Sequence, residues 1–256
     1  MKPFQLCSRF RTILFICLIA AIFLIQRAEA TIVGIYGSAS TGQFAGRVSS
    51  MGYDVEFWWL PTQITPASLI NIDVLYVQSG QTPELTNEAA TISTWVNQGN
   101  GLIIEQPNKT GPVAILPASL PISIWSKDYD GSTVGPDPVR NVQVTDTGML
   151  HPVTIGLGTN DICQNYDRVR RSDVAAGYDI LGVQISNTNY VAIAAAEYGA
   201  GRIVFHTGTG APNAFTPGSD TYFRQMLDWV GVPEPVSPLL LIFGIAAARR
   251  RVSREL

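Results

Sequence analysis

The chain has 256 residues, of which 46% are hydrophobic and only 14% are charged, and its formal net charge is −3. A soluble domain usually carries about a quarter charged residues, so part of this chain is expected to lie outside the soluble domain. Residues 31–231 hold 9 Lys or Arg and 17 Asp or Glu, a net charge of −8. This balance argues against a nucleic-acid or anionic-membrane binder, because both need a basic face.

The first 30 residues have the layout of a secretory signal peptide. A basic start precedes an apolar run over 12–25, and Ala28 and Ala30 form an A-x-A cleavage site. As a helix this run would rise about 21 Å, less than the roughly 30 Å hydrocarbon core, which favours a cleaved signal over a membrane-anchored first helix. Cleavage by signal peptidase would leave Cys163 as the one cysteine, a free thiol with no internal disulfide partner.

Residues 31–231 alternate between short apolar runs and segments with apolar positions at helical spacing, which predicts one α/β domain. Strands are expected at 31–36, 53–60, 73–78, 102–105, 178–183, 191–196 and 202–206, and helices near 44–48 and over 86–98 and 220–230. Asn100 and its flanking glycines at 99 and 101 should end the second of these helices. The pattern favours a mainly parallel sheet with helices on both faces, with antiparallel edge strands or a hairpin over 190–206.

The last 25 residues, 232–256, combine a proline-rich break, an apolar segment over 238–248 and an arginine cluster. The segment is roughly 17 Å long as a helix, too short to span a membrane comfortably. This order closely resembles the PEP-CTERM sorting domain of Gram-negative bacteria. The matching residues are Val232, Pro233, Glu234 and Pro235 for the motif and Arg249, Arg250 and Arg251 for the cluster.

The resemblance implies processing by an exosortase, an integral-membrane transpeptidase that cleaves near the Pro-Glu-Pro motif. The chain would have a transient transmembrane anchor in the inner membrane, with its arginines on the cytoplasmic side. It would then reach the cell surface or the extracellular matrix, in bacteria that make exopolysaccharide and biofilm. The alternative for this segment is a hydrophobic core helix with a charged tail, which the prolines disfavour.

The segment 31–231 also resembles class I glutamine amidotransferase-like domains, most closely the ThuA-like branch. The resemblance rests on short motifs at 73–77, 95–104, 151–157 and 198–204, which occur in the order seen in that family. It implies a flavodoxin-like sheet, but a shared fold does not bring an activity with it.

The nucleophile of those amidotransferases has no counterpart here. They need a cysteine on a sharp, glycine-flanked turn after a central strand, and the matching strand 102–105 is followed by Gln106-Pro107-Asn108. Cys163 lies in a different segment without a glycine elbow, which indicates a buried free thiol. The missing nucleophile favours a non-catalytic domain.

The remaining polar candidates lie where two predicted strands end. Glu105 and Gln106 follow one strand, and His206 and Thr207 follow another, at the edge where α/β proteins usually bind ligands. A purely structural role for His206 is the competing interpretation, and His151 is expected to cap a turn. Two isolated histidines do not make a zinc site, so no metal and no cofactor are expected.

Three weaker patterns bear on other ligands. The segment 127–131 with Asp137 faintly resembles a calcium loop but fails the EF-hand spacing. The glycines after the first strand lack the dinucleotide-binding spacing. Phe57, Trp58, Trp59 and Trp125 could stack on sugars, although two of them are expected in the core.

Two hypotheses therefore stand. In the first, the chain is an exported surface or matrix protein whose non-catalytic domain binds carbohydrate, such as exopolysaccharide, or another surface component. In the second, it is an exported hydrolase with an untypical site near Glu105 and His206.

Overall fold

The structure is a computed structural model, and it describes residues 31–37, 41–78, 81–105, 110–127, 140–164, 167–208 and 218–231. The predicted signal peptide (1–30) and sorting signal (232–256) lie outside these ranges, so their expected elements are not placed. Within the described ranges, no helix has both the length and the apolar character needed to cross a membrane.

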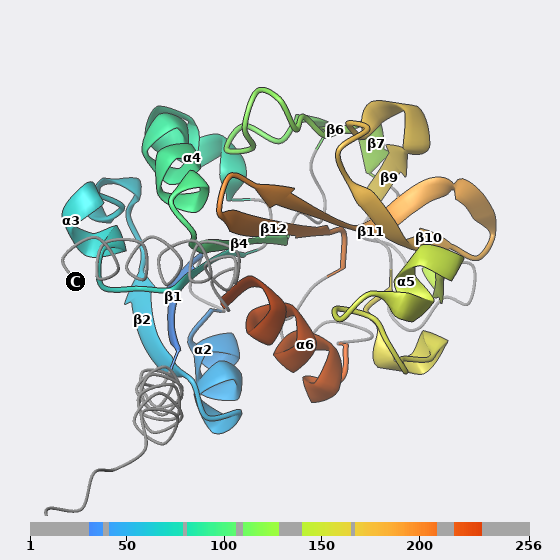
Figure 1. Ribbon diagram of the computed structural model, residues 1–256, viewed down its shortest axis with the longest axis horizontal. Coiled ribbons are helices and arrows are strands. Elements are labelled where there is room, and N and C mark those ends of the chain that lie inside the picture. Colours follow the sequence, from blue (N-terminus) through green and yellow to red (C-terminus); the bar gives the residue numbers. More distant parts are fainter. Residues whose placement is uncertain are drawn as a thin grey trace, which may run out of the picture.

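Parallel strands form one half of the main sheet (Figure 1). In spatial order they are β2 (Asp54–Trp58), β1 (Ile32–Tyr36), β3 (Val74–Val77), β4 (Gly101–Glu105) and β12 (Gly201–His206). Each neighbouring pair in this order is parallel. Every residue of β3 and β4 is buried, as expected for strands that are covered on both faces. The predicted parallel α/β sheet is confirmed.

Antiparallel strands extend the sheet beyond β12. They are β11 (Asn187–Tyr198), β10 (Asp179–Gln184) and β8 (Val142–Val144), with β9 (Asp167–Arg170) and β7 (Ser126–Lys127) branching from β11. The hairpin of β11 and β12 pairs Ile193 with His206 and Tyr198 with Gly201, which confirms the predicted antiparallel hairpin. A separate small sheet pairs β5 (Gly111–Pro112) with β6 (Ser123–Ile124).

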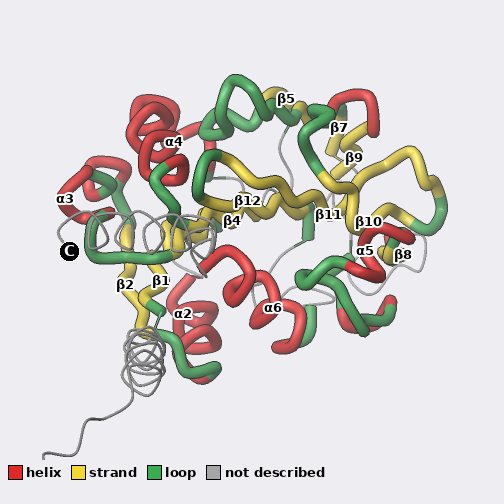
Figure 2. The backbone as a smooth tube through the Cα atoms, in the orientation of Figure 1, coloured by secondary structure: helices red, strands yellow, loops and turns green. Residues whose placement is uncertain are grey.

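Helices cover both faces of the sheet, as Figure 2 shows. On one face lie α2 (Thr41–Ser50) and α6 (Asp220–Gly231), on the other α3 (Pro66–Leu69) and α4 (Ala89–Asn97), and α5 (Asp146–Leu150) packs beside β8 and β10. Short 3-10 turns occupy Pro61–Gln63, Thr82–Glu88, Thr159–Asp161 and Arg171–Asp173. Helix α4 stops before Gly99, whose φ of 118° suits the left-handed region, as the glycines at 99 and 101 predict.

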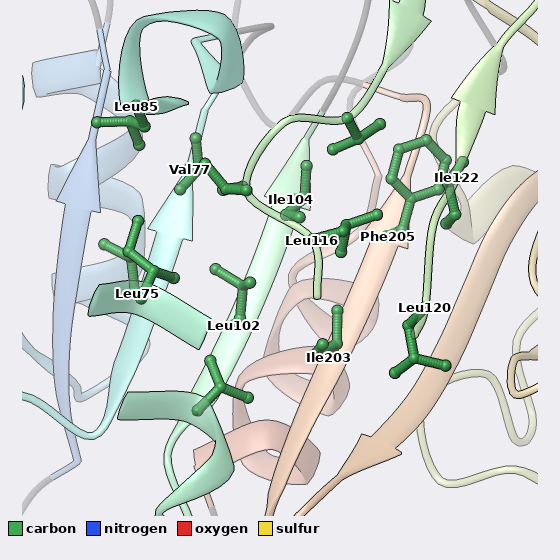
Figure 3. Close-up of a cluster of buried hydrophobic side chains, with 14 of the residues drawn as sticks. Leu75, Val77, Leu85, Leu102, Ile104, Leu116, Leu120, Ile122, Ile203 and Phe205 are labelled. Carbon is green, nitrogen blue, oxygen red and sulfur yellow. The ribbon is translucent and has the colours of Figure 1, made fainter. Parts of the chain in front are cut away.

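The two faces of β4 contribute to two separate hydrophobic layers. Leu102 and Ile104 pack with Ile203 and Phe205 on the α4 side (Figure 3), whereas Ile103 packs with the cluster under α2 and α6. This division follows from the alternation of side chains along a strand. The α2 and α6 side also receives Tyr76, which brings a polar hydroxyl toward the carboxyl edge of the sheet.

Several boundaries differ from the sequence-based expectation. The helix expected over 86–98 begins as a 3-10 turn over Thr82–Glu88 and becomes α-helical only at Ala89. Strand β2 ends at Trp58 because a 3-10 turn starts at Pro61, so the strand expected over 53–60 is too long at its end. Strands β8 and β9 were not expected, because each is short and offers only two inward-facing positions.

Candidate functional site

Three neighbouring strands bring polar side chains to the carboxyl edge of the sheet. Glu105 is the last residue of β4, His206 is the last residue of β12, and the two are direct partners in the strand register. Tyr76 comes from β3, whose register places Val77 beside Ile104. The predicted candidates Glu105 and His206 are therefore brought together, at the edge where ligands bind in α/β sheets.

The Tyr76 hydroxyl joins these side chains. Tyr76 Oη donates to Glu105 Oε2 at 2.7 Å and lies 3.0 Å from His206 Nε2. A hydroxyl has one proton, so once that proton is donated to Glu105 the oxygen accepts from the N–H at Nε2. The neutral imidazole of His206 then presents Nδ1 as an acceptor.

Burial decides the ionisation of this cluster. Tyr76 and Glu105 are fully buried, and His206 is 1% exposed. Desolvation lowers the pKa of His206 to about 3, so the imidazole is neutral near pH 7. Burial, reinforced by Glu105, raises the pKa of Tyr76 well above its ordinary value, which keeps the phenol protonated as a donor.

Cys163 packs beside the same cluster. Its thiol is buried, and the backbone N–H of Gly218 donates to Sγ at 3.2 Å. Burial, with Glu105 nearby, raises the pKa of this thiol to about 12. The thiol is therefore protonated at neutral pH and is a poor nucleophile, which agrees with the predicted buried free thiol.

Several buried polar atoms at this edge have no hydrogen-bond partner among the described residues. They are both amide atoms of Gln78, which follows β3, together with His206 Nδ1 and the hydroxyl of Tyr222 from α6. Leaving such a group unsatisfied costs roughly 1–3 kcal/mol. Within the part of the chain that the structure describes, the carboxyl edge is therefore polar and buried, and several of its hydrogen-bonding groups lack a partner.

Gln78, Tyr76 and Tyr222 belong to this cluster but were not expected there from the sequence. Gln78 carried a usable signal, since it is a large polar residue directly after an all-apolar strand. Tyr76 and Tyr222 offered none, because a tyrosine at an apolar position is indistinguishable from an ordinary core residue.

The other predicted site residues are placed as follows. Thr207 is buried beside His206, and its backbone N–H donates to Ala192 O at 3.0 Å, so it has a structural role in the hairpin. Gln106 lies outside the described residues, as do Ala28, Ala30, Val232, Pro233, Glu234, Pro235, Arg249, Arg250 and Arg251.

His151 lies apart from the carboxyl-edge cluster. Its Nδ1 accepts from the backbone N–H of Val153 at 3.2 Å, which is the turn-capping contact expected from the sequence. Its ring meets Trp229 edge-on with centroids 4.7 Å apart, and burial lowers its pKa.

Within the described ranges, no group of three His, Cys, Asp or Glu side chains could hold a metal ion. Most of the segment that resembled a calcium loop lies outside those ranges.

The aromatic candidates divide between core and surface. Trp58 is buried and Phe57 packs against the core under α2 and α6, whereas Trp59 and Trp125 are about half exposed. Phe57 and Trp59 share a face of the chain and meet edge-on at 4.3 Å, as their strand positions predict. Trp125 lies directly before β7, and its ring packs against Arg170 of β9 and Tyr190 of β11.

Comparison with known proteins finds no matching family model and no matching curated protein. Solved structures do match. A ThuA-like protein from Bacteroides uniformis has a TM-score of 0.54 at 12% identity, covering 79% of this chain and 93% of its own. A GMP synthase subunit from Thermoplasma acidophilum has a TM-score of 0.53 at 14% identity, covering 89% and 100%.

The same fold also occurs inside a larger protein. A cold-adapted β-galactosidase from Rahnella sp. R3 matches with a TM-score of 0.52 at 13% identity, covering 81% of this chain but only 32% of that one. At identities of 12–14%, these matches show a shared fold and do not show a shared activity. The described part of the chain therefore has an α/β fold similar to that of a ThuA-like protein and of a GMP synthase subunit.

Proposed function

We propose that this chain is an exported cell-surface or extracellular-matrix protein whose α/β domain binds carbohydrate or another hydroxyl-rich surface component without catalysing a reaction. The binding site is the carboxyl edge of β3, β4 and β12. Tyr76, Glu105 and His206 form its floor, and Gln78 adds an amide beside it.

The unsatisfied polar atoms at this edge carry the proposal. The Gln78 amide offers both a donor and an acceptor, and His206 Nδ1 offers an acceptor. A sugar hydroxyl both donates and accepts hydrogen bonds, so it can supply the partners that these groups lack. An apolar ligand would leave them without hydrogen bonds. The likeness of the fold to part of a β-galactosidase is compatible with a sugar ligand.

The protonated thiol of Cys163 supports binding over cysteine-based catalysis. A thiol with a pKa of about 12 supplies almost no thiolate at neutral pH. This favours a recognition domain over a cysteine-based enzyme.

The proposed destination rests on the two ends of the sequence. Signal peptidase would cleave after Ala30, and an exosortase would recognise the segment 232–256 during a transient stay in the inner membrane. The product would be a surface or matrix component of a Gram-negative, biofilm-forming bacterium. Exopolysaccharide is the partner that fits both this destination and a hydroxyl-binding site.

A hydrolase remains the second candidate, and one observation favours it. His206 Nδ1 has no partner among the described residues, so it is placed to accept a hydrogen bond from a water, although the lowered pKa makes the imidazole a weak base. In this alternative Tyr76 and Glu105 orient the ring through Nε2.

Ligand-induced stabilisation of the full-length chain in a neutral detergent tests the binding site. The probes are fragments of the host exopolysaccharide and its component neutral sugars, because a ligand that binds only the native state raises Tm by mass action. Gln78→Met should abolish this rise while leaving the unliganded Tm unchanged or higher, since it removes an unsatisfied amide. Gln143→Met, at an exposed position of β8, is the matched control and should keep the rise.

Turnover separates the two candidates. A binding domain should leave the same fragments uncleaved in prolonged incubation, whereas a hydrolase should cleave them and lose cleavage in His206→Gln. Binding that survives Gln78→Met would remove the carboxyl edge as the site.

The mass of the protein recovered from the surface of its host tests the proposed sorting. We expect the loss of residues 1–30 and of everything beyond the Pro-Glu-Pro region. A surface form that still carries Arg249–Arg251 would contradict exosortase processing.

A further inference from the structure

Positive charge is concentrated at one corner of an otherwise acidic domain. Arg168, Arg170 and Arg171 fall within four positions, although residues 31–231 hold only 9 Lys or Arg in all. Arg168 and Arg170 lie on β9, which pairs with both β7 and β11. The alternation along β9 buries Asp167 and Val169 and turns both arginines outward.

Aromatic rings hold these arginines in place. Arg170 lies opposite Tyr190 in the β9 and β11 register, and its guanidinium sits 3.8 Å from the ring centroid of Trp125. Trp125 and Tyr190 are stacked at 16° with centroids 6.4 Å apart, and Arg168 lies 5.7 Å from the Tyr190 centroid. Stacking fixes the plane of a guanidinium and so prepares its N–H fork for a planar anion.

A groove of about 370 Å³ opens beside this stack. It is lined by Arg170, Arg171, Ser172, Asn187, Asn189 and Tyr190. In the part of the chain that the structure describes, neither Arg170 nor Arg171 makes an ion pair. Their charges are therefore available to a ligand.

The polar side chains of the groove point to a ligand that also carries hydroxyl groups. Ser172 Oγ donates to Asp173 Oδ1 at 3.2 Å, so its oxygen is left to accept a hydrogen bond. Asn187 Oδ1 accepts from the backbone N–H of Asn189 at 3.1 Å, which leaves the Asn187 amide N–H groups as donors. A ligand with hydroxyl groups would use both the acceptor at Ser172 and the donors at Asn187.

We propose that this groove binds a sugar acid, with the carboxylate on Arg170 and Arg171 and the ring hydroxyls on Ser172 and Asn187. Paired N–H donors of arginine match the two oxygens of a carboxylate. The half-exposed ring of Trp125, beside the groove, adds an aromatic surface for the C–H side of an adjoining sugar. The site is separate from the carboxyl edge and does not depend on the function proposed for that edge.

Single-stranded nucleic acid is the competing occupant, since arginines and aromatic rings also serve as base-stacking platforms. The observations favour the sugar acid. A nucleic acid needs a basic track along several phosphates, whereas here the positive charge is local and the domain around it is acidic.

Titration calorimetry on the full-length chain in neutral detergent tests the proposal. The probes are tetragalacturonate, its methyl-esterified form, sodium phosphate and a thymidine tetranucleotide. We expect tetragalacturonate to bind, and its ester to bind about tenfold or more weakly, because esterification removes the charge that Arg170 and Arg171 recognise. Arg170→Gln should weaken tetragalacturonate binding by a similar factor.

Matched variants separate this groove from other effects. Arg224→Gln removes one positive charge from an exposed position of α6, and Trp59→Ala removes a tryptophan that is 49% exposed, against 47% for Trp125. Both controls should bind as the unmodified chain does, whereas Trp125→Ala should bind more weakly. Gln78→Met should also leave tetragalacturonate binding intact, which distinguishes this groove from the carboxyl-edge site.

Four outcomes would overturn the proposal. One is equal binding of the acid and its ester, and another is equal binding by Arg170→Gln and Arg224→Gln. The third is tighter binding of phosphate or of the tetranucleotide than of tetragalacturonate. No binding of tetragalacturonate at millimolar concentration would also reject it.

Discussion

Gly208 lies directly against Cys163 where the chain leaves β12. A Cβ at position 208 would stand 2.2 Å from the Cys163 Cβ, far inside van der Waals contact. The absence of a side chain at 208 therefore allows the buried thiol to pack beside the Tyr76, Glu105 and His206 cluster.

Gly208→Ala should destabilise the fold by about 1–3 kcal/mol, the range for overpacking a well-filled core. Urea unfolding measures the change. Gly46→Ala, in α2 with nothing within 4 Å of the added Cβ, should instead be neutral or stabilising by up to about 1 kcal/mol. Equal effects of the two variants would show that the contact with Cys163 is not decisive.

Cys163 should resist alkylation in the native protein. Its pKa of about 12 leaves little thiolate at pH 8, and its thiol is buried. Mass spectrometry after iodoacetamide treatment should find Cys163 unmodified without urea and modified with it. Rapid labelling of the native protein would contradict the description of this thiol.

Stability should fall as the pH drops from about 6.5 towards 3. The pKa of His206 is lowered to about 3 in the folded state, so the unfolded chain binds its proton first and is favoured through this window. The slope from one such group is at most about 1.4 kcal/mol per pH unit. His151, whose pKa is also lowered, acts in the same direction.

His206→Gln tests the assignment of this slope. The variant has no titrating group at position 206, so its unfolding free energy should depend less steeply on pH between 3 and 6.5. An unchanged slope would assign the effect to other groups.

Tyr76→Phe should cost about 1–3 kcal/mol, because it removes the hydroxyl that serves both Glu105 and His206 in a buried site. Chemical unfolding checks the size. Tyr198→Phe is the control, since the Tyr198 hydroxyl accepts from Ser93 at 3.2 Å in a part-buried position. Its cost should stay below about 1 kcal/mol.

The parallel half of the fold could be predicted because its strands leave a clear pattern. Runs such as Val74–Val77 and Gly101–Glu105 are almost entirely apolar up to their last residue, as expected for strands covered on both faces. Strand β9, in contrast, has only Val169 as an apolar residue among Asp167, Arg168 and Arg170. Its position is fixed by pairing with β11 and β7, which no local pattern encodes.

The candidate site was predictable only in part. The ends of two strands indicated Glu105 and His206 separately, but their direct pairing depends on β12 lying next to β4, nearly 100 residues away in the chain. The role of Tyr76 depends on where its hydroxyl lies after packing. The sequence therefore predicts which polar residues reach the edge more readily than which of them touch.

The late position of β12 also bears on how the domain is assembled. This strand lies between β4 and β11, and its residues 201–206 come after every other strand of the sheet that the structure describes. A nascent chain that ends before Gly201 would expose the unpaired backbone of β4, with Leu102, Ile103 and Ile104 beside it, as an aggregation-prone edge. Closure of the sheet must therefore wait for almost the whole domain to be synthesised.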